Sequence, residues 1–336
     1  MLRGKQTWEF ENRPTIISTG ITGGPFEAKG NLTATFDQLY NDLRLEQNSF
    51  EQAHQLLLES ACQHALRKSN ITKEAVQFLI AGDLINQITP TSFTARTYQI
   101  PYIGTFSACA TSMESLALAA NLINSNNANY VLTGSSSHNA AVEKQFRYPT
   151  EYGGQKPPTA QWTVTGAGVG LLANKGDGPK VTSATIGKVV DMGMTDPFNM
   201  GEAMAPAAID TIATHLMDRG IDASYYDCII TGDLAEIGRS IALELAKQKN
   251  ILLNTDTFLD CGLMLYKKDQ QVFAGASGSG CSAVVTYGHL INQLNDKKLN
   301  KILVVATGAL LSPLTVQQKQ SIPCIAHAVS IENGGR

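Results

Sequence analysis

The sequence has few charged residues and no block of one sign. Of its 336 residues 16% are charged, and the formal net charge is -3. A nucleic-acid-binding surface needs clustered Lys and Arg, so we expect no nucleic-acid partner. Long apolar runs are also missing, because none approaches the ~18 residues that indicate a membrane-spanning helix. Residues 1–20 lack the apolar core of a signal peptide, and we therefore expect synthesis in the cytosol.

Cysteines are few and form no CxxC pair. They stand at positions 62, 109, 228, 261, 281 and 324. In a chain without a signal peptide, this spacing predicts neither a disulfide framework nor a zinc site. We accordingly expect no resident metal and no bound cofactor.

Short apolar segments closed by small residues alternate with segments of helical periodicity. The predicted strands are 77–82, 129–134, 168–173, 227–232 and 302–308, and the predicted helices are 49–68, 109–124, 206–219 and 234–249. Alternation of this kind predicts an α/β fold whose strands are mostly buried and parallel.

The sequence also repeats itself. Three pairs of segments match in the same order: IAGDL (80–84) with ITGDL (230–234), TFSAC (105–109) with TFLDC (257–261), and NYVLTGSSS (129–137) with ILVVATGAL (302–310). This register predicts two copies of one βα unit. We place the first half at 1–175 and the second at 176–336, joined at the turn-rich segment GDGPKVTS.

Cys109 stands in GTFSACATSMESLALAANLI (104–123), where a predicted strand end meets a helix start. A helix N-terminus carries partial positive charge, lowers the pKa of a nearby thiol and can bind an anion. Free cysteine is equally suited to fill a small buried space. The residues alone leave both interpretations open. Cys261 has a similar setting in LDCG, where packing is the favoured interpretation.

The segment SACATSMESLALA resembles the nucleophile segment of the thiolase superfamily, particularly its ketoacyl-synthase III branch. WTVTGAGVGLLAN (162–174) and GASGSGCSAVV (275–285) are similar to two glycine-rich segments of the same family. The resemblance implies a duplicated five-layer α-β-α-β-α fold with Cys109 at the head of a central buried helix. It also implies homodimerisation, which is a property of the fold.

The sequence departs from that family at its acid–base residues. Where the resemblance implies a histidine after the second-half strand, this chain has Thr231, Gly232 and Asp233, and the late loop GASGSGCSA lacks the expected histidine or asparagine. We expect the six histidines to be structural or solvated, His327 being the least certain of them. We therefore expect a protein that is not an enzyme, with no catalytic residue and with Cys109 at the ancestral nucleophile position. The alternative is an acyl-CoA-dependent acyltransferase or condensing enzyme with Cys109 as nucleophile.

A closer resemblance rests on DMGMTDPFNMGEAMAPAA (191–208), the paired GDL segments and SACATSMESLA. These are similar to the stage V sporulation protein AD family. The resemblance implies a protein that binds dipicolinic acid (pyridine-2,6-dicarboxylate) and is required for its uptake into the developing spore, with a link to spore germination. It also implies membrane partners, the other stage V sporulation A subunits, and a peripheral place on the forespore or spore inner membrane. A structural subunit with a vestigial pocket is a further alternative.

Such a ligand needs hydrogen-bond donors for two carboxylates and apolar walls for a ring. The predicted ligand-binding residues are Cys109, Asp83, Asp233, Met194, Phe198, Ser277, Gly278, Ser279 and Gly280, with Met200 and Ser282 as further candidates. Asp83 and Asp233 would hold water or a Ca²⁺ ion that accompanies the ligand, and helix capping is their alternative role. Arg147, Arg239 and Lys156 are candidates for a carboxylate clamp, although solvated surface positions are the favoured interpretation for all three. The segment 147–161 is an excursion that suits a lid, a partner surface or a dimer contact.

Overall fold

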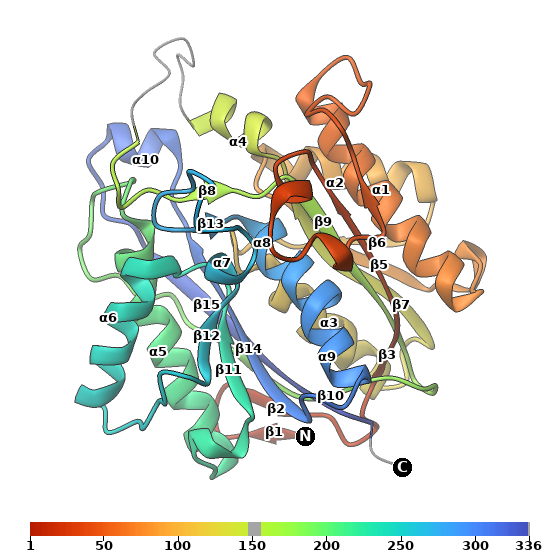
Figure 1. Ribbon diagram of the computed structural model, residues 1–336. Coiled ribbons are helices and arrows are strands. Elements are labelled where there is room, and N and C mark those ends of the chain that lie inside the picture. The colour runs from red at the N-terminus through yellow and green to blue at the C-terminus, as the bar shows by residue number, and fades with distance from the viewer. Residues whose placement is uncertain (147–155, 335–336) are drawn as a thin grey trace.

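The computed structural model describes residues 1–146 and 156–334. Ten of its strands form one continuous path across a large mixed sheet (Figure 1). In spatial order these strands are β12 (Phe258–Asp260), β11 (Cys228–Thr231), β14 (Lys301–Ala309), β15 (Cys324–Glu332), β10 (Lys180–Ile186), β3 (Thr15–Gly23), β9 (Gly166–Ala173), β7 (Tyr130–Ser137), β5 (Phe78–Gly82) and β6 (Tyr102–Gly104). The five strands predicted from the sequence are β5, β7, β9, β11 and β14, and all are confirmed.

The strand order is the same on both sides of the sheet centre. From the centre outward, β3-β9-β7-β5-β6 on one side corresponds to β10-β15-β14-β11-β12 on the other. In each series the first two pairings are antiparallel and the last two are parallel. The two series meet where Lys180 of β10 pairs with Thr15 of β3. A duplicated unit would produce this symmetry. The predicted junction GDGPKVTS begins in the turn between β9 and β10, and its last four residues belong to β10.

Two pairs of helices cover the outer faces of the sheet. On the first half these are α1 (Phe50–Ser69) and α2 (Thr89–Tyr98), and on the second half α5 (Met200–Arg219) and α6 (Ala235–Gln248). Each pair buries its own apolar cluster against its half of the sheet. The predicted start of this helix was residue 206, a proline. Helix α5 begins six residues earlier and continues through Pro206.

Two helical segments fill the space between the two sheet halves. One is α3 (Thr111–Asn124), and the other is α8 (Ser279–Val284), which continues through η7 (Val285–Leu290) into α9 (Ile291–Asn295). Met113, Leu116 and Ile123 of α3 are fully buried in a cluster that takes side chains from both halves. The layers are therefore helix, sheet, helix, sheet and helix, which confirms the predicted five-layer fold class.

Several short elements gather at one end of the molecule, where the parallel strands have their carboxyl ends (Figure 1). They are α4 (Asn139–Phe146), α7 (Cys261–Met264), α10 (Pro313–Gln317) and the parallel pair β8 (Trp162–Thr163) and β13 (Ala276–Ser277). The carboxyl ends of parallel strands are the usual place for ligand sites in α/β proteins. Within the described residues, none of the helices combines the length and hydropathy that crossing a bilayer requires.

Candidate functional site

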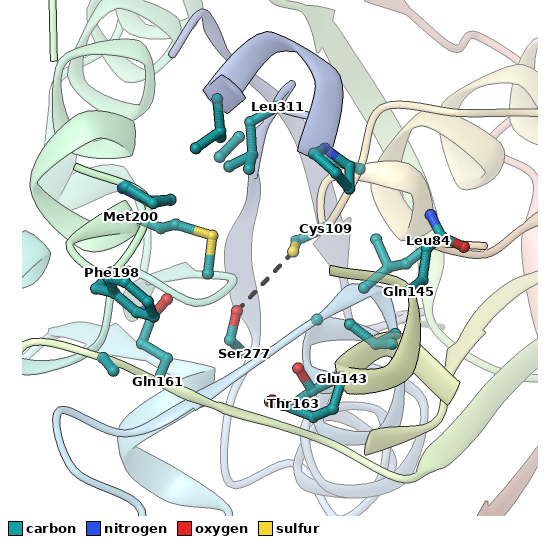
Figure 2. A pocket seen from close by; sticks show the side chains of 18 of the residues that line it. Leu84, Cys109, Glu143, Gln145, Gln161, Thr163, Phe198, Met200, Ser277 and Leu311 are labelled. Atoms are coloured by element: carbon teal, nitrogen blue, oxygen red, sulfur yellow. Dashed lines mark hydrogen bonds between the residues drawn. The ribbon is translucent and has the colours of Figure 1, made fainter. Parts of the chain in front are cut away.

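A cavity of about 400 Å³ opens among these short elements, with Cys109 and Ser277 between its two sides (Figure 2). Its lining residues are Leu84, Phe106, Ala108, Cys109, Val142, Glu143, Gln145, Ala160, Gln161, Thr163, Pro197, Phe198, Met200, Ser277, Gly278, Ala309, Leu311, Pro313, Val316 and Gln317. The lining is largely apolar, with a few polar side chains among the apolar ones. That size and composition are typical of small-molecule sites.

Cys109 lies in a tight turn between β6 and α3. Ala108 has a positive φ of 48°, which a residue with a Cβ rarely adopts. The turn is held by Thr111, whose hydroxyl donates to the carbonyl of Ala108 and accepts from the N–H of Ser107. Gly308 of β14 packs directly against it, since a Cβ at that position would lie 2.2 Å from the carbonyl oxygen of Ser107. Backbone geometry therefore fixes the cysteine at the cavity.

The Cys109 thiol is held in its neutral form. Its residue is 7% exposed, and its Sγ lies 3.9 Å from Ser277 Oγ, the contact drawn in Figure 2. Burial raises the pKa of the Cys109 thiol well above its ordinary value, and the negative charge of Asp233 with its hydrogen bond to the thiol raises that pKa further. In a nucleophilic cysteine a cation or a helix N-terminus lowers the pKa of the thiol. Cys109 does stand just before α3, but burial and Asp233 act on its pKa in the opposite direction.

Asp233 lies directly beneath the cavity floor, at the end of β11. It is 1% exposed and does not line the cavity itself. Its Oδ2 accepts hydrogen bonds from Ser277 Oγ at 2.8 Å and from the Gly278 N–H at 3.1 Å. Its Oδ1 accepts from Thr307 Oγ1 at 2.8 Å. The carboxylate thus positions the two floor residues, Ser277 and Gly278.

His327 is buried close to the cysteine turn but makes structural contacts. Its Nδ1 accepts from the N–H of Gly187, so its Nε2 carries the hydrogen and donates to Ser107 Oγ at 3.1 Å. Burial lowers the pKa of His327 to about 4, which keeps the ring neutral. No histidine lines the cavity within the described residues.

The wall opposite Phe198 and Met200 comes from α4 and the segment after β5 (Figure 2). Glu143 of α4 pairs with Lys156, whose Nζ lies 2.6 Å from Oε1. Gln145 exchanges two hydrogen bonds with Asn86, which hold its amide in place. The cavity wall therefore combines the Glu143–Lys156 ion pair with several amide side chains around an apolar centre.

The structure brings four of the predicted ligand-binding residues together at the cavity. They are Cys109, Phe198, Ser277 and Gly278, and the further candidate Met200 joins them. Asp83 is elsewhere, because its carboxylate accepts from the N–H groups of Ile85 and Thr91 at the start of α2. Asp83 thus has its alternative role, capping the start of α2, and burial raises the pKa of its carboxyl to about 6.

The remaining predicted residues lie outside the cavity lining. Met194 packs against the outer cluster of the second half. Ser279 and Gly280 bond to Ser136 and Ser137 of β7 at the start of α8, and Ser282 bonds to Ser112. Arg239 donates to the carbonyls of Thr255 and Phe258. Lys156 is at the cavity wall through its ion pair with Glu143, and Arg147, with most of the predicted excursion, lies outside the described residues.

Several lining residues were not predicted from the sequence, among them Thr163, Leu311 and Gln317. Thr163 is brought beside Ser277 by the pairing of β8 with β13. The segment WTVTGAG, which contains Thr163, predicted a glycine-rich strand and gave no indication of a ligand-binding threonine. Nothing in the segment 311–317 indicated a cavity wall. Among the described residues, no group of three or more His, Cys, Asp or Glu is arranged to hold a metal ion.

Solved structures with the same architecture are condensing enzymes and a thiolase. The 3-oxoacyl-[acyl-carrier-protein] synthase III of Aquifex aeolicus superposes with a TM-score of 0.60 at 13% identity, covering 95% of this chain and 99% of that one. Human mitochondrial 3-ketoacyl-CoA thiolase gives a TM-score of 0.57 at 12% identity, covering 96% of this chain and 100% of that one. At these identities the similarity establishes the thiolase-like fold alone.

The sequence matches are closer. The model of the family "Stage V sporulation protein AD (SpoVAD)" matches residues 4–332. The stage V sporulation protein AD of Bacillus subtilis (strain 168) is 50% identical over 334 residues, covering 99% of this chain and 98% of that protein. The chain thus belongs to the stage V sporulation protein AD family and carries its sporulation-protein sequence on a thiolase-like fold.

Proposed function

We propose that this protein binds dipicolinate in the Cys109 cavity, without covalent chemistry, and serves its uptake into the developing spore. One observation carries the proposal: the cavity at the nucleophile position is retained, while a buried carboxylate, Asp233, stands beside the thiol where a condensing enzyme needs a histidine.

The cavity suits a flat aromatic dicarboxylate. Phe198 and Met200 on one side, with Leu311, offer apolar surface for a ring (Figure 2). Thr163 and Gln161 offer a hydroxyl and an amide that can hydrogen-bond a carboxylate. A pocket of this kind holds its ligand by apolar burial and fixes its orientation by a few polar contacts.

The alternative, acyl transfer from coenzyme A thioesters, has less support. Covalent catalysis needs a thiolate, and the carboxylate of Asp233 disfavours a second negative charge on Cys109. The described lining also supplies no general base in the position of the missing histidine. Removal of one oxyanion donor alone typically costs ~10²–10³ in rate.

Glu143 in the wall raises the question of a cation. A free dianion in the cavity would lie near this carboxylate and near the Lys156 ammonium that pairs with it. A Ca²⁺ ion carried by the ligand would reduce the repulsion. We therefore propose that the protein accepts dipicolinate with or without Ca²⁺, and that any metal comes with the ligand.

We also propose a homodimer, formed at the open edge of β6. Ile103 of this strand is 39% exposed and Phe106, beside the cavity, is 52% exposed. Ile103→Asp is expected to convert a dimer into a monomer in sedimentation, because it places a charge in an apolar strand-edge contact. Leu252→Asp is the control, since Leu252 is 91% exposed elsewhere. A dimer that survives Ile103→Asp would exclude this edge.

The proposed role in dipicolinate uptake includes membrane partners, the other stage V sporulation A subunits, and a peripheral place of this protein on the forespore membrane.

The binding proposal is tested by calorimetric titration of the purified chain with pyridine-2,6-dicarboxylate and, separately, with its 2,4-isomer. We expect saturable binding of the 2,6-isomer and at least about tenfold weaker binding of the 2,4-isomer, a difference of ~1.4 kcal/mol from one misplaced carboxylate. Equal affinity for the two isomers would contradict recognition of both carboxylates. Absence of binding would favour a subunit with a vestigial cavity.

A further inference from the structure

We propose that the cavity takes up one proton from solvent when it binds an anionic ligand, and that this proton goes to the carboxylate of Asp233 beneath the floor. The inference rests on the proposed function, since it concerns the binding of a dicarboxylate at the same site.

Among the described residues, Asp233 is a buried carboxylate without a cationic partner. It is 1% exposed, and its carboxylate accepts from the hydroxyls of Ser277 and Thr307, the N–H of Gly278 and the Cys109 thiol. None of the ion pairs formed among the described residues includes it. A further negative charge near such a carboxylate favours its protonated form.

The titratable groups that face Asp233 add no positive charge. They are Cys109 before α3, Asp260 of β12, Cys261 of α7, Cys281 of α8 and Cys324 of β15. Burial raises the pKa of each of the four thiols, so they are neutral near pH 7. Burial likewise raises the pKa of Asp260 to about 7 and raises that of Asp233. An anion in the cavity would therefore lie close to one or two buried carboxylates and no buried cation among the described groups that face Asp233.

Ser277 connects the carboxylate to the ligand. In the structure its hydroxyl donates to Asp233 Oδ2, so only oxygen lone pairs are left to face the cavity. A ligand carboxylate placed there would meet another acceptor. Once Oδ2 carries a proton, that proton can be donated to Ser277 Oγ, and the Ser277 hydrogen becomes free to donate to the ligand.

Protonation of Asp233 then strengthens ligand binding, and ligand binding raises the pKa of Asp233. A dianion enters, one proton comes from solvent, and the complex has one negative charge less than it would otherwise have. By linkage, affinity for the dianion rises as pH falls, by up to about tenfold per pH unit. The affinity rises with falling pH only between two limits, the pKa of Asp233 in the ligand complex and its lower pKa in the free protein. Below the pKa of the free protein the affinity no longer changes with pH.

The test is a titration with dipicolinate at pH 7.5 in two buffers, phosphate and Tris, whose ionisation enthalpies differ strongly. The dependence of the observed enthalpy on buffer gives the number of protons taken up, which we expect to be about one per ligand. Asp233→Asn should bind with uptake near zero and with an affinity that no longer changes with pH. Asp83→Asn is the matched control, because it removes a second buried aspartate, which bonds to the first turn of α2 and does not line the cavity.

Each outcome decides the matter. Binding by the native chain with no proton uptake overturns this inference and leaves the proposed function intact. Uptake that persists in Asp233→Asn shows that the proton goes elsewhere and also overturns it. Absence of any binding removes both proposals. Should Asp233→Asn fail to fold in a thermal-unfolding check, the pH dependence of the native chain's affinity still decides, since a flat dependence contradicts the inference.

Discussion

Ala309→Trp is expected to abolish dipicolinate binding while leaving the protein folded. Ala309 ends β14, is 7% exposed and lines the cavity, so an indole at this position would occupy the space that the ligand needs. The expected loss of affinity is on the order of 100-fold or more, or about 2.8 kcal/mol. Calorimetry measures the affinity, and thermal unfolding checks the fold.

Two controls accompany this variant. Ala309→Ser changes the same position with little added volume and should bind normally. Leu252→Trp adds an indole at a residue that is 91% exposed and does not line the cavity. Native affinity in a folded Ala309→Trp protein would mean that dipicolinate binds outside the cavity.

The second large effect concerns the reactivity of Cys109. Because burial and Asp233 both raise the pKa of its thiol, we expect alkylation by iodoacetamide at pH 8 to be at least about 100-fold slower than that of a free cysteine. Asp233→Asn removes the neighbouring negative charge and should accelerate alkylation by about tenfold for each unit by which the pKa falls. Mass spectrometry of the Cys109 peptide gives the rate.

The same assay distinguishes binding from acyl transfer. After incubation with acyl-CoA, the native protein should carry no acyl group on Cys109, and Cys109→Ala should give an identical mass spectrum apart from the substitution. An acyl adduct that disappears in Cys109→Ala would establish the enzyme alternative. Alkylation as fast as that of free cysteine would contradict the neutral thiol described above.

The sequence predicted the framework well because the framework is local and periodic. Five buried strands and the helices between them follow from runs of apolar residues closed by glycine, and the echo of IAGDL in ITGDL follows from the repeated strand order. Identical motifs nevertheless have different surroundings in the two halves. Asp83 bonds to Thr91, which lies 8 residues further along the chain. Asp233 bonds to Ser277 and Thr307, which lie 44 and 74 residues further along.

The cavity walls were harder to predict, because they consist of single side chains from irregular segments. Phe198 and Met194 are four residues apart in the same non-helical stretch, yet only Phe198 lines the cavity. Gln317 and Leu311 belong to a segment without a motif. Thr163 belongs to a glycine-rich segment that was interpreted by its backbone conformation and not by its side chains. A side chain's place in such segments depends on tertiary contacts that periodicity does not encode.

The crystal structure of the chain with dipicolinate tests the central claim most directly. We predict the ring between Phe198 and Leu311, one carboxylate at Ser277 and Thr163, and Cys109 unmodified beneath it. Ligand density at another surface, or an acylated Cys109 in protein crystallised after exposure to acyl-CoA, would contradict the account.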